Sequence, residues 1–103
     1  MKVAAIQMVS AVSLQANLDE AHRLLSEAAR AGAELAVLPE YFCLMGHKDS
    51  DKLAVRERFG EGVVQGFLAQ TSRELGLWLV GGTLPLQATD DAHVRNANLV
   101  FSP

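Results

Sequence analysis

A short apolar run, residues 35–38, ends at Pro39 and is followed at once by the acidic Glu40. Four apolar residues closed by a proline are typical of a buried strand, because proline cannot continue the hydrogen-bond ladder of a sheet. In open α/β sheets, ligands bind just beyond the carboxyl ends of the parallel strands. Glu40 therefore stands where a working carboxylate is expected, provided that the rest of the chain builds a parallel sheet.

The segments before this run predict the first part of such a sheet. Residues 3–9 form a continuous apolar segment that indicates a strand, and apolar residues at helical spacing across residues 14–29 indicate an amphipathic helix. Ser13 or Asn17 is the expected N-cap of that helix, and Gly32 suits the left-handed position beyond its end. Strand, helix and strand at this spacing predict a right-handed βαβ unit.

The second half of the chain continues the α/β pattern. A second helix is predicted at residues 63–75 and ends at Gly76, a third strand at residues 77–80, and a fourth, antiparallel strand at residues 95–101. The prediction is a single α/β domain over residues 1–103, with about four strands and two helices. Since two helices cover only one face of the sheet, we expect the isolated chain to expose apolar sheet and to associate.

Composition and charge narrow the classes of function. Nine basic and twelve acidic residues leave a formal net charge of −3 without any basic run, so a nucleic-acid partner is not expected. No apolar segment approaches the roughly 18 to 20 residues of a membrane helix, and the apolar start is too short for a signal peptide. The single cysteine, Cys43, excludes an internal disulfide and fits a reducing compartment. We therefore expect a cytoplasmic protein without a membrane partner.

Three patterns that suggest chemistry have simpler structural explanations. His22, His47 and His93 lie on different predicted elements, so metal binding is not expected. The string GEGVVQG at residues 60–66 is similar to a dinucleotide-binding motif, but a charged segment precedes it instead of an apolar strand. Trp78 lies in an apolar strand and is expected in the core. The sequence predicts no cofactor.

From its position alone, Glu40 is either a turn cap or a catalytic acid, and the surrounding string favours the second. The string AELAVLPEYF at residues 33–42 resembles the first signature of the nitrilase, or carbon-nitrogen hydrolase, superfamily. The likeness continues along the chain, with Gln7 in the first strand, residues 17–18 at the helix start, the glycine pair at residues 81–82, and VRNANLVFSP at residues 94–103.

The resemblance implies the amino-terminal part of an α-β-β-α sandwich, in which two sheets face each other between layers of helices. It also implies a Glu-Lys-Cys mechanism with Glu40 as the general base, which takes a thiol proton as the sulfur attacks an amide or nitrile carbon. Tyr41 and Phe42 are candidates for the substrate pocket, with core packing as the alternative. The string around Glu40 is most similar to omega-amidases and deaminated glutathione amidases, which implies a small linear amide as substrate and a homo-oligomer.

The sequence departs from the family pattern at the other two catalytic residues. The family lysine and nucleophilic cysteine lie beyond the strand that ends at Pro103, so this chain alone is expected to be inactive. Cys43 lies in the same loop as Glu40 and is expected to be an apolar filler. Lys48 and Lys52 are expected to be solvated loop residues. The alternative is a non-catalytic α/β binding or interaction module that is complete at this length.

Overall fold

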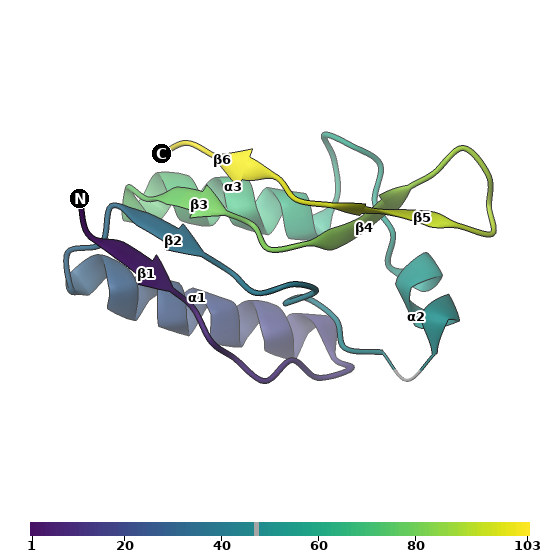
Figure 1. Cartoon of the computed structure of the whole chain (residues 1–103), viewed down its shortest axis with the longest axis horizontal. Coiled ribbons are helices and arrows are strands. Elements are labelled where there is room, and N and C mark those ends of the chain that lie inside the picture. The colour runs from purple at the N-terminus through teal and green to yellow at the C-terminus, as the bar shows by residue number, and fades with distance from the viewer. Residues whose placement is uncertain (47) are drawn as a thin grey trace.

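The computed structural model describes residues 1–46 and 48–103, and this part of the chain forms a mixed sheet, a small hairpin and three helices (Figure 1). The α/β class is therefore confirmed. The elements follow in the order β1 (Val3–Ala5), α1 (Leu14–Arg30), β2 (Leu35–Val37), α2 (Asp49–Ala54), α3 (Val63–Leu75), β3 (Trp78–Val80), β4 (Leu84–Gln87), β5 (Val94–Ala97) and β6 (Val100–Phe101).

The main sheet has the strand order β1-β2-β3-β6. β1, β2 and β3 are parallel to one another, and β6 runs antiparallel to β3. β1, α1 and β2 thus form the predicted βαβ unit. α1 and α3 lie on the same face of the sheet, and the carboxyl ends of β1, β2 and β3 point toward the β4–β5 hairpin (Figure 1).

α1 begins at a serine cap. The Oγ of Ser13 accepts a hydrogen bond from the backbone N–H of Ala16 at 3.2 Å, so Ser13 is the N-cap of the two candidates. Asn17 is instead buried and bonds to the loops beside it. Gly32, just past the end of the helix, has a φ of 93°, which is the left-handed geometry expected of it.

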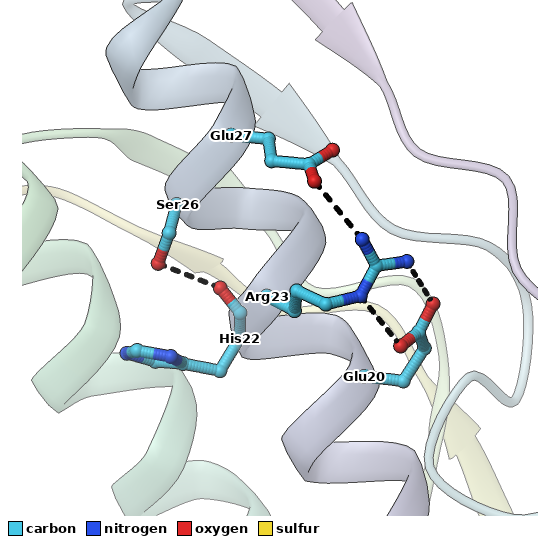
Figure 2. Close-up of polar contacts among 5 residues, drawn as sticks. All are labelled: Glu20, His22, Arg23, Ser26 and Glu27. Carbon is cyan, nitrogen blue, oxygen red and sulfur yellow. Dashed lines mark hydrogen bonds and ion pairs between the residues drawn. The ribbon is translucent and has the colours of Figure 1, made fainter.

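The exposed face of α1 carries a short ladder of ion pairs (Figure 2). The guanidinium of Arg23 lies 2.6 Å from Glu20 and 2.9 Å from Glu27, and its contact with Glu20 lowers the pKa of that carboxyl group. The ring of His22 extends away from this ladder toward α3, where its centroid lies 6.4 Å from that of Phe67. Because the ion pairs are exposed, they contribute little, and α1 is held mainly by its apolar face.

The core lies between the sheet and the two long helices. Ala36 of β2 and Leu79 of β3 are fully buried on the helix-facing side of the sheet. Their main helical neighbours in the core are Leu18, Ala21, Leu25, Val64 and Leu68. α3 has the predicted bounds, and Gly76 ends it in the left-handed conformation with a φ of 66°.

The opposite face of the sheet has no cover within the described residues. Side chains alternate along each strand, so the residues that flank the buried positions all point away from the helices. They are Val3, Ala5, Leu35, Val37, Trp78, Val80 and Val100. Val3 is 54%, Trp78 47% and Val100 58% exposed, so the expectation that Trp78 is a core residue is wrong. Leu79, its neighbour, points to the helices and fills that role.

The strands differ from the prediction in their bounds. The first strand pairs only over Val3–Ala5, although Ile6 still donates its N–H to the carbonyl of Val37 at 2.9 Å. The segment predicted as one strand at residues 95–101 is divided between β5, which pairs with β4, and β6, which pairs with β3. β4 itself was not predicted, because Pro85 within it argues against a strand unless the strand lies at an edge.

The uncovered face predicts that the 103-residue chain associates with itself. Apolar side chains in a contiguous row favour contact with another surface over contact with water. In sedimentation velocity, the chain should form dimers or larger species, and Trp78→Lys should shift it toward the monomer. Val9→Lys is the matched control, because Val9 is 94% exposed but lies outside the sheet. A monodisperse monomer that unfolds cooperatively at all concentrations would contradict this prediction.

Candidate functional site

Glu40 lies at the edge of the sheet where the three parallel strands end. Leu38 makes the last contact of this segment with the sheet, as its N–H bonds to the carbonyl of Val80 at 2.9 Å, and Pro39 then ends the pairing. Glu40 is exposed at the start of the turn that follows. Asn96 of β5 donates a hydrogen bond from its side-chain amide to Oε1 of Glu40 at 3.4 Å. The carboxylate therefore stands at the expected edge and is held by a neutral group.

A small cavity opens beside this carboxylate. Its volume is about 230 Å³, and its lining residues are Glu40, Tyr41, Leu44, Met45, Gly46, Lys48 and Lys52. The ammonium nitrogen of Lys52 lies 4.1 Å from the centroid of the Tyr41 ring, which is within the range of a cation–π contact. Two lysines and one glutamate thus surround a space that suits a small molecule.

The two lysines that line the cavity differ in their exposure. Lys48 is exposed at the N-cap of α2, as expected of a solvated loop residue, whereas Lys52 is partly buried against the Tyr41 ring. Both line the cavity. Lys48 is the N-cap of α2 and Lys52 lies in its last turn, four residues later, so this short helix places both on the same side. The sequence signal for this arrangement was weak, because α2 has only six residues.

Tyr41 has an unusual backbone conformation. Its φ is 47°, and it is the one non-glycine residue with a positive φ in the part of the chain that the structure describes. Its N–H donates to Oγ1 of Thr83 at 2.8 Å. Partial burial of the ring, and then the negative charge of Glu40, raise the pKa of Tyr41. Tyr41 lines the cavity, as a substrate-binding residue should, but that role stays a prediction.

Phe42 lies in the core. Its side chain is fully buried, its ring centroid is 6.5 Å from that of Phe67, and its carbonyl accepts a hydrogen bond from the Oγ of Ser10 at 2.7 Å. Phe42 does not line the cavity beside Glu40. Of the two alternatives for this residue, core packing matches its position in this chain, and a contact with substrate remains untested.

Cys43 has the properties of an apolar filler. Its side chain is fully buried, and this burial raises the pKa of its thiol from 9.0 to about 11. Its carbonyl accepts a hydrogen bond from the side-chain amide of Asn17 at 2.7 Å. Because a thiol must lose its proton to act as a nucleophile, Cys43 is poorly suited to attack a substrate.

The raised pKa of Cys43 predicts a loss of stability at high pH. The unfolded chain ionises its thiol near pH 9, whereas the folded chain keeps the proton until about pH 11. Below pH 9 this stabilisation is therefore fully present, and it is lost as the pH rises toward 11. The loss should be about 2 to 3 kcal/mol.

The measurement is the free energy of unfolding in urea at several pH values, compared with Cys43→Ala, which should lack this part of the dependence. Equal slopes for both chains would contradict the assignment. Iodoacetamide offers a second check, because it should label Cys43 slowly in the folded chain and quickly in urea.

The glycine-rich segment before α3 is occupied by the chain's own carboxylate. Glu57 accepts hydrogen bonds from the backbone N–H of Val64 at 2.6 Å and of Gln65 at 3.1 Å, which are the free donors at the start of the helix. A phosphate group at this helix end would meet the negative charge of Glu57. This geometry agrees with the interpretation that GEGVVQG is not a nucleotide-binding motif.

A larger cavity of about 430 Å³ lies beside α3 and β6, and it is less suited to catalysis. It is lined mainly by apolar groups and glycines, among them Phe59, Gly66 and Phe101, and Glu61 is its only titratable lining residue. The smaller cavity at Glu40 combines an acid with two cations at the carboxyl edge of the sheet. We therefore take the smaller cavity as the candidate site.

The histidines do not gather at any site that the structure describes. His22 lies near Phe67, and His93 lies 2.8 Å from Asp90, whose pKa it lowers. His47 falls outside the described residues. In residues 1–46 and 48–103, no group of three or more His, Cys, Asp or Glu side chains could hold a metal ion.

No helix in residues 1–46 and 48–103 is long and apolar enough to span a membrane.

Comparison with known proteins gives a consistent result. The sequence model of the family described as "Carbon-nitrogen hydrolase" matches residues 2–103. The chain is 38% identical over 81 residues to the deaminated glutathione amidase of Mus musculus, and this alignment covers 78% of this chain and 25% of that protein. It is 35% identical over 88 residues to the omega-amidase NIT2 of Xenopus tropicalis, and this alignment covers 84% of this chain and 30% of that protein.

Solved structures agree at the level of the fold. Nit3 of Saccharomyces cerevisiae, a member of the nitrilase superfamily, superposes with a TM-score of 0.84 at 24% identity, over 99% of this chain and 40% of that chain. A carbon-nitrogen hydrolase of Helicobacter pylori superposes with a TM-score of 0.78 at 18% identity, over 96% of this chain and 35% of that chain. The chain thus matches the amino-terminal part of a nitrilase fold and spans about a quarter to a third of the length of the curated relatives.

Proposed function

The chain belongs to the carbon-nitrogen hydrolase family, and we propose that its Glu40 serves as the general base in the hydrolysis of a small linear amide. The observation that carries this proposal is the position of Glu40, which follows β2 at the carboxyl edge of the sheet and lines a cavity of about 230 Å³. Its contact with the neutral Asn96 supports the same role. This hydrogen bond restricts the orientation of the carboxylate without adding a positive charge.

The proposed chemistry is that of a Glu-Lys-Cys set. A thiol is mostly protonated at neutral pH, so Glu40 removes its proton while the sulfur attacks the amide carbon. The amine then leaves with a proton, and Glu40 activates the water that hydrolyses the thioester. Such proton transfer contributes about 10² to 10⁴ in rate. On the family pattern, the lysine and the nucleophilic cysteine come from outside residues 1–103, and the burial of Cys43 supports this division.

The charges around the cavity bear on the substrate. Lys48 and Lys52 line it together with Glu40, so the lining carries one more positive than negative charge. This balance supports an amide that also bears an anionic group, held by the lysines while its amide faces Glu40. Tyr41 is proposed as a wall of this pocket, whereas Phe42 is buried in the core and does not line it. We further propose that the whole protein is a cytoplasmic homo-oligomer without nucleic-acid or membrane partners.

The second candidate function is a non-catalytic interaction module. The uncovered apolar face that includes Val3, Trp78 and Val100 favours it, because such a surface also suits a partner protein. The genomic reading frame beyond Pro103 separates the two functions. A frame that continues with a lysine-containing segment and a later cysteine supports the hydrolase, whereas an in-frame stop supports the module.

The first functional prediction concerns the 103-residue chain by itself. It should release no ammonia from ω-amides of dicarboxylic acids, because Cys43 is buried and protonated and no other thiol is present. Ammonia release in a coupled assay, compared with Cys43→Ala, is the measurement. Turnover that Cys43→Ala abolishes would make Cys43 the nucleophile and would overturn the proposed division of the catalytic set.

The second functional prediction concerns Glu40 in a protein that carries this chain together with the rest of the family fold. Glu40→Gln keeps the shape of the side chain but removes the base, so kcat should fall by about 10² to 10⁴. The melting temperature should stay close to that of the parent, because Glu40 is exposed. Glu34→Gln is the matched control, since Glu34 is an exposed acid at the other end of β2. Near-normal turnover of Glu40→Gln would remove Glu40 from the mechanism.

A further inference from the structure

The turn that carries Glu40 is held in a costly backbone conformation. A non-glycine residue at positive φ is strained and persists only where its surroundings enforce it. Tyr41 adopts such a conformation directly after Glu40, with a φ of 47°. Its N–H donates to Oγ1 of Thr83 at 2.8 Å, and Thr83 lies in the turn between β3 and β4. The hydroxyl of Thr83 is thus one group that enforces this backbone.

The turn between β3 and β4 also packs closely against the backbone just before Glu40. Gly82 is buried at a φ of 63°, and a Cβ atom built on it would collide with the carbonyl oxygen of Pro39. The carbonyl of Gly82 accepts a hydrogen bond from the side-chain amide of Asn98. The turn between β3 and β4 is therefore fixed in position and leaves the residues on both sides of Glu40 little freedom.

A second group acts on the carboxylate itself. Asn96 lies opposite Pro85 in the β4–β5 hairpin and donates its side-chain amide to Oε1 of Glu40. Within the described residues, no hydrogen bond to Oε2 of Glu40 accompanies it. An amide donor restricts the orientation of a carboxylate and adds no positive charge, so the second oxygen stays available as an acceptor.

We propose that Thr83 and Asn96 are positioning residues for Glu40. Thr83 sets the direction in which the Glu40 side chain leaves the turn, because it holds the left-handed backbone of Tyr41. Asn96 then restricts the carboxylate through Oε1 and leaves Oε2 as the oxygen that can accept a proton. As a role in catalysis this inference rests on the proposed function, but the restriction of Glu40 can be measured without it.

The test uses nuclear magnetic resonance on the 103-residue chain, in the Trp78→Lys background if association broadens the signals. The HN–Hα coupling of Tyr41 reports φ, and the Hα–Hβ couplings of Glu40 report rotamer averaging. Thr83→Val removes the hydroxyl that accepts the hydrogen bond from the Tyr41 N–H and nearly keeps the shape of the side chain. It should change the HN–Hα coupling of Tyr41 and bring the Hα–Hβ couplings of Glu40 to rotamer-averaged values. Thr83→Ser restores the hydroxyl and should restore both. Unchanged couplings in Thr83→Val would overturn the role of Thr83.

Asn96 supplies an independent arm of the test. Asn96 is exposed, so Asn96→Ala should leave the fold and the Tyr41 coupling unchanged while the Glu40 couplings become averaged. Arg95→Ala is the matched control, because Arg95 is also exposed, is adjacent on β5 and points to the other face of the hairpin. Glu40 couplings that are the same in Asn96→Ala and in the parent would overturn the role of Asn96.

Kinetics separate this inference from the proposed function. In a protein with the whole family fold, Thr83→Val should lower kcat by about 10²-fold, as expected for a misplaced catalytic group. In the Glu40→Gln background, the same change should cost little more, because Thr83 acts through Glu40. A further large loss there would show that Thr83 has another role. Normal turnover of Glu40→Gln would remove the proposed function, and the couplings would still decide whether Glu40 is positioned.

Discussion

The pairing of β2 with a parallel strand on each side is the constraint on which the candidate site depends. β2 lies between β1 and β3, and its central residue Ala36 is fully buried under the helices. The ladder extends past the strand through the bond from Leu38 to Val80, and Pro39 then ends it. Because both neighbours fix this strand, the point at which the chain leaves the sheet is fixed as well, and Glu40 is the first residue beyond it.

Two other parts of the chain complete the surroundings of the turn. On one side, the buried amide of Asn17 bonds to the carbonyls of Ala11 and Cys43 and accepts the N–H of Ala11, all at 2.7 Å. These bonds join the first turn of α1 to the loop that follows Glu40. On the other side, Glu57 ties the start of α3 to β4 by backbone bonds to Pro85 and Gln87. The turn therefore lies between two anchored segments rather than in a free loop.

Much of this arrangement could be predicted from local patterns, and the remainder depends on contacts between distant residues. The βαβ unit and α3 follow from apolar periodicity, and Glu40 stands out because a buried strand precedes it. The exposure of Trp78 could also have been inferred, since a strand residue next to a buried Leu79 must face the opposite side. β4 was missed because Pro85 weakens any strand signal. The partial burial of Lys52 against Tyr41 had no clear sequence signal, because a helix as short as α2 leaves almost no periodic pattern.

The roles of Thr83 and Asn96 had no local signal at all, because their partners lie 42 and 56 residues earlier in the chain. This separation has a consequence for the order of folding. Contacts between residues far apart in sequence form late, since the intervening loop must be closed first. During synthesis, Glu40 leaves the ribosome well before the hairpin that restrains it. Glu40 is thus among the earlier residues to be made, while the contacts that hold it and its turn in place are among the last features of the domain to form.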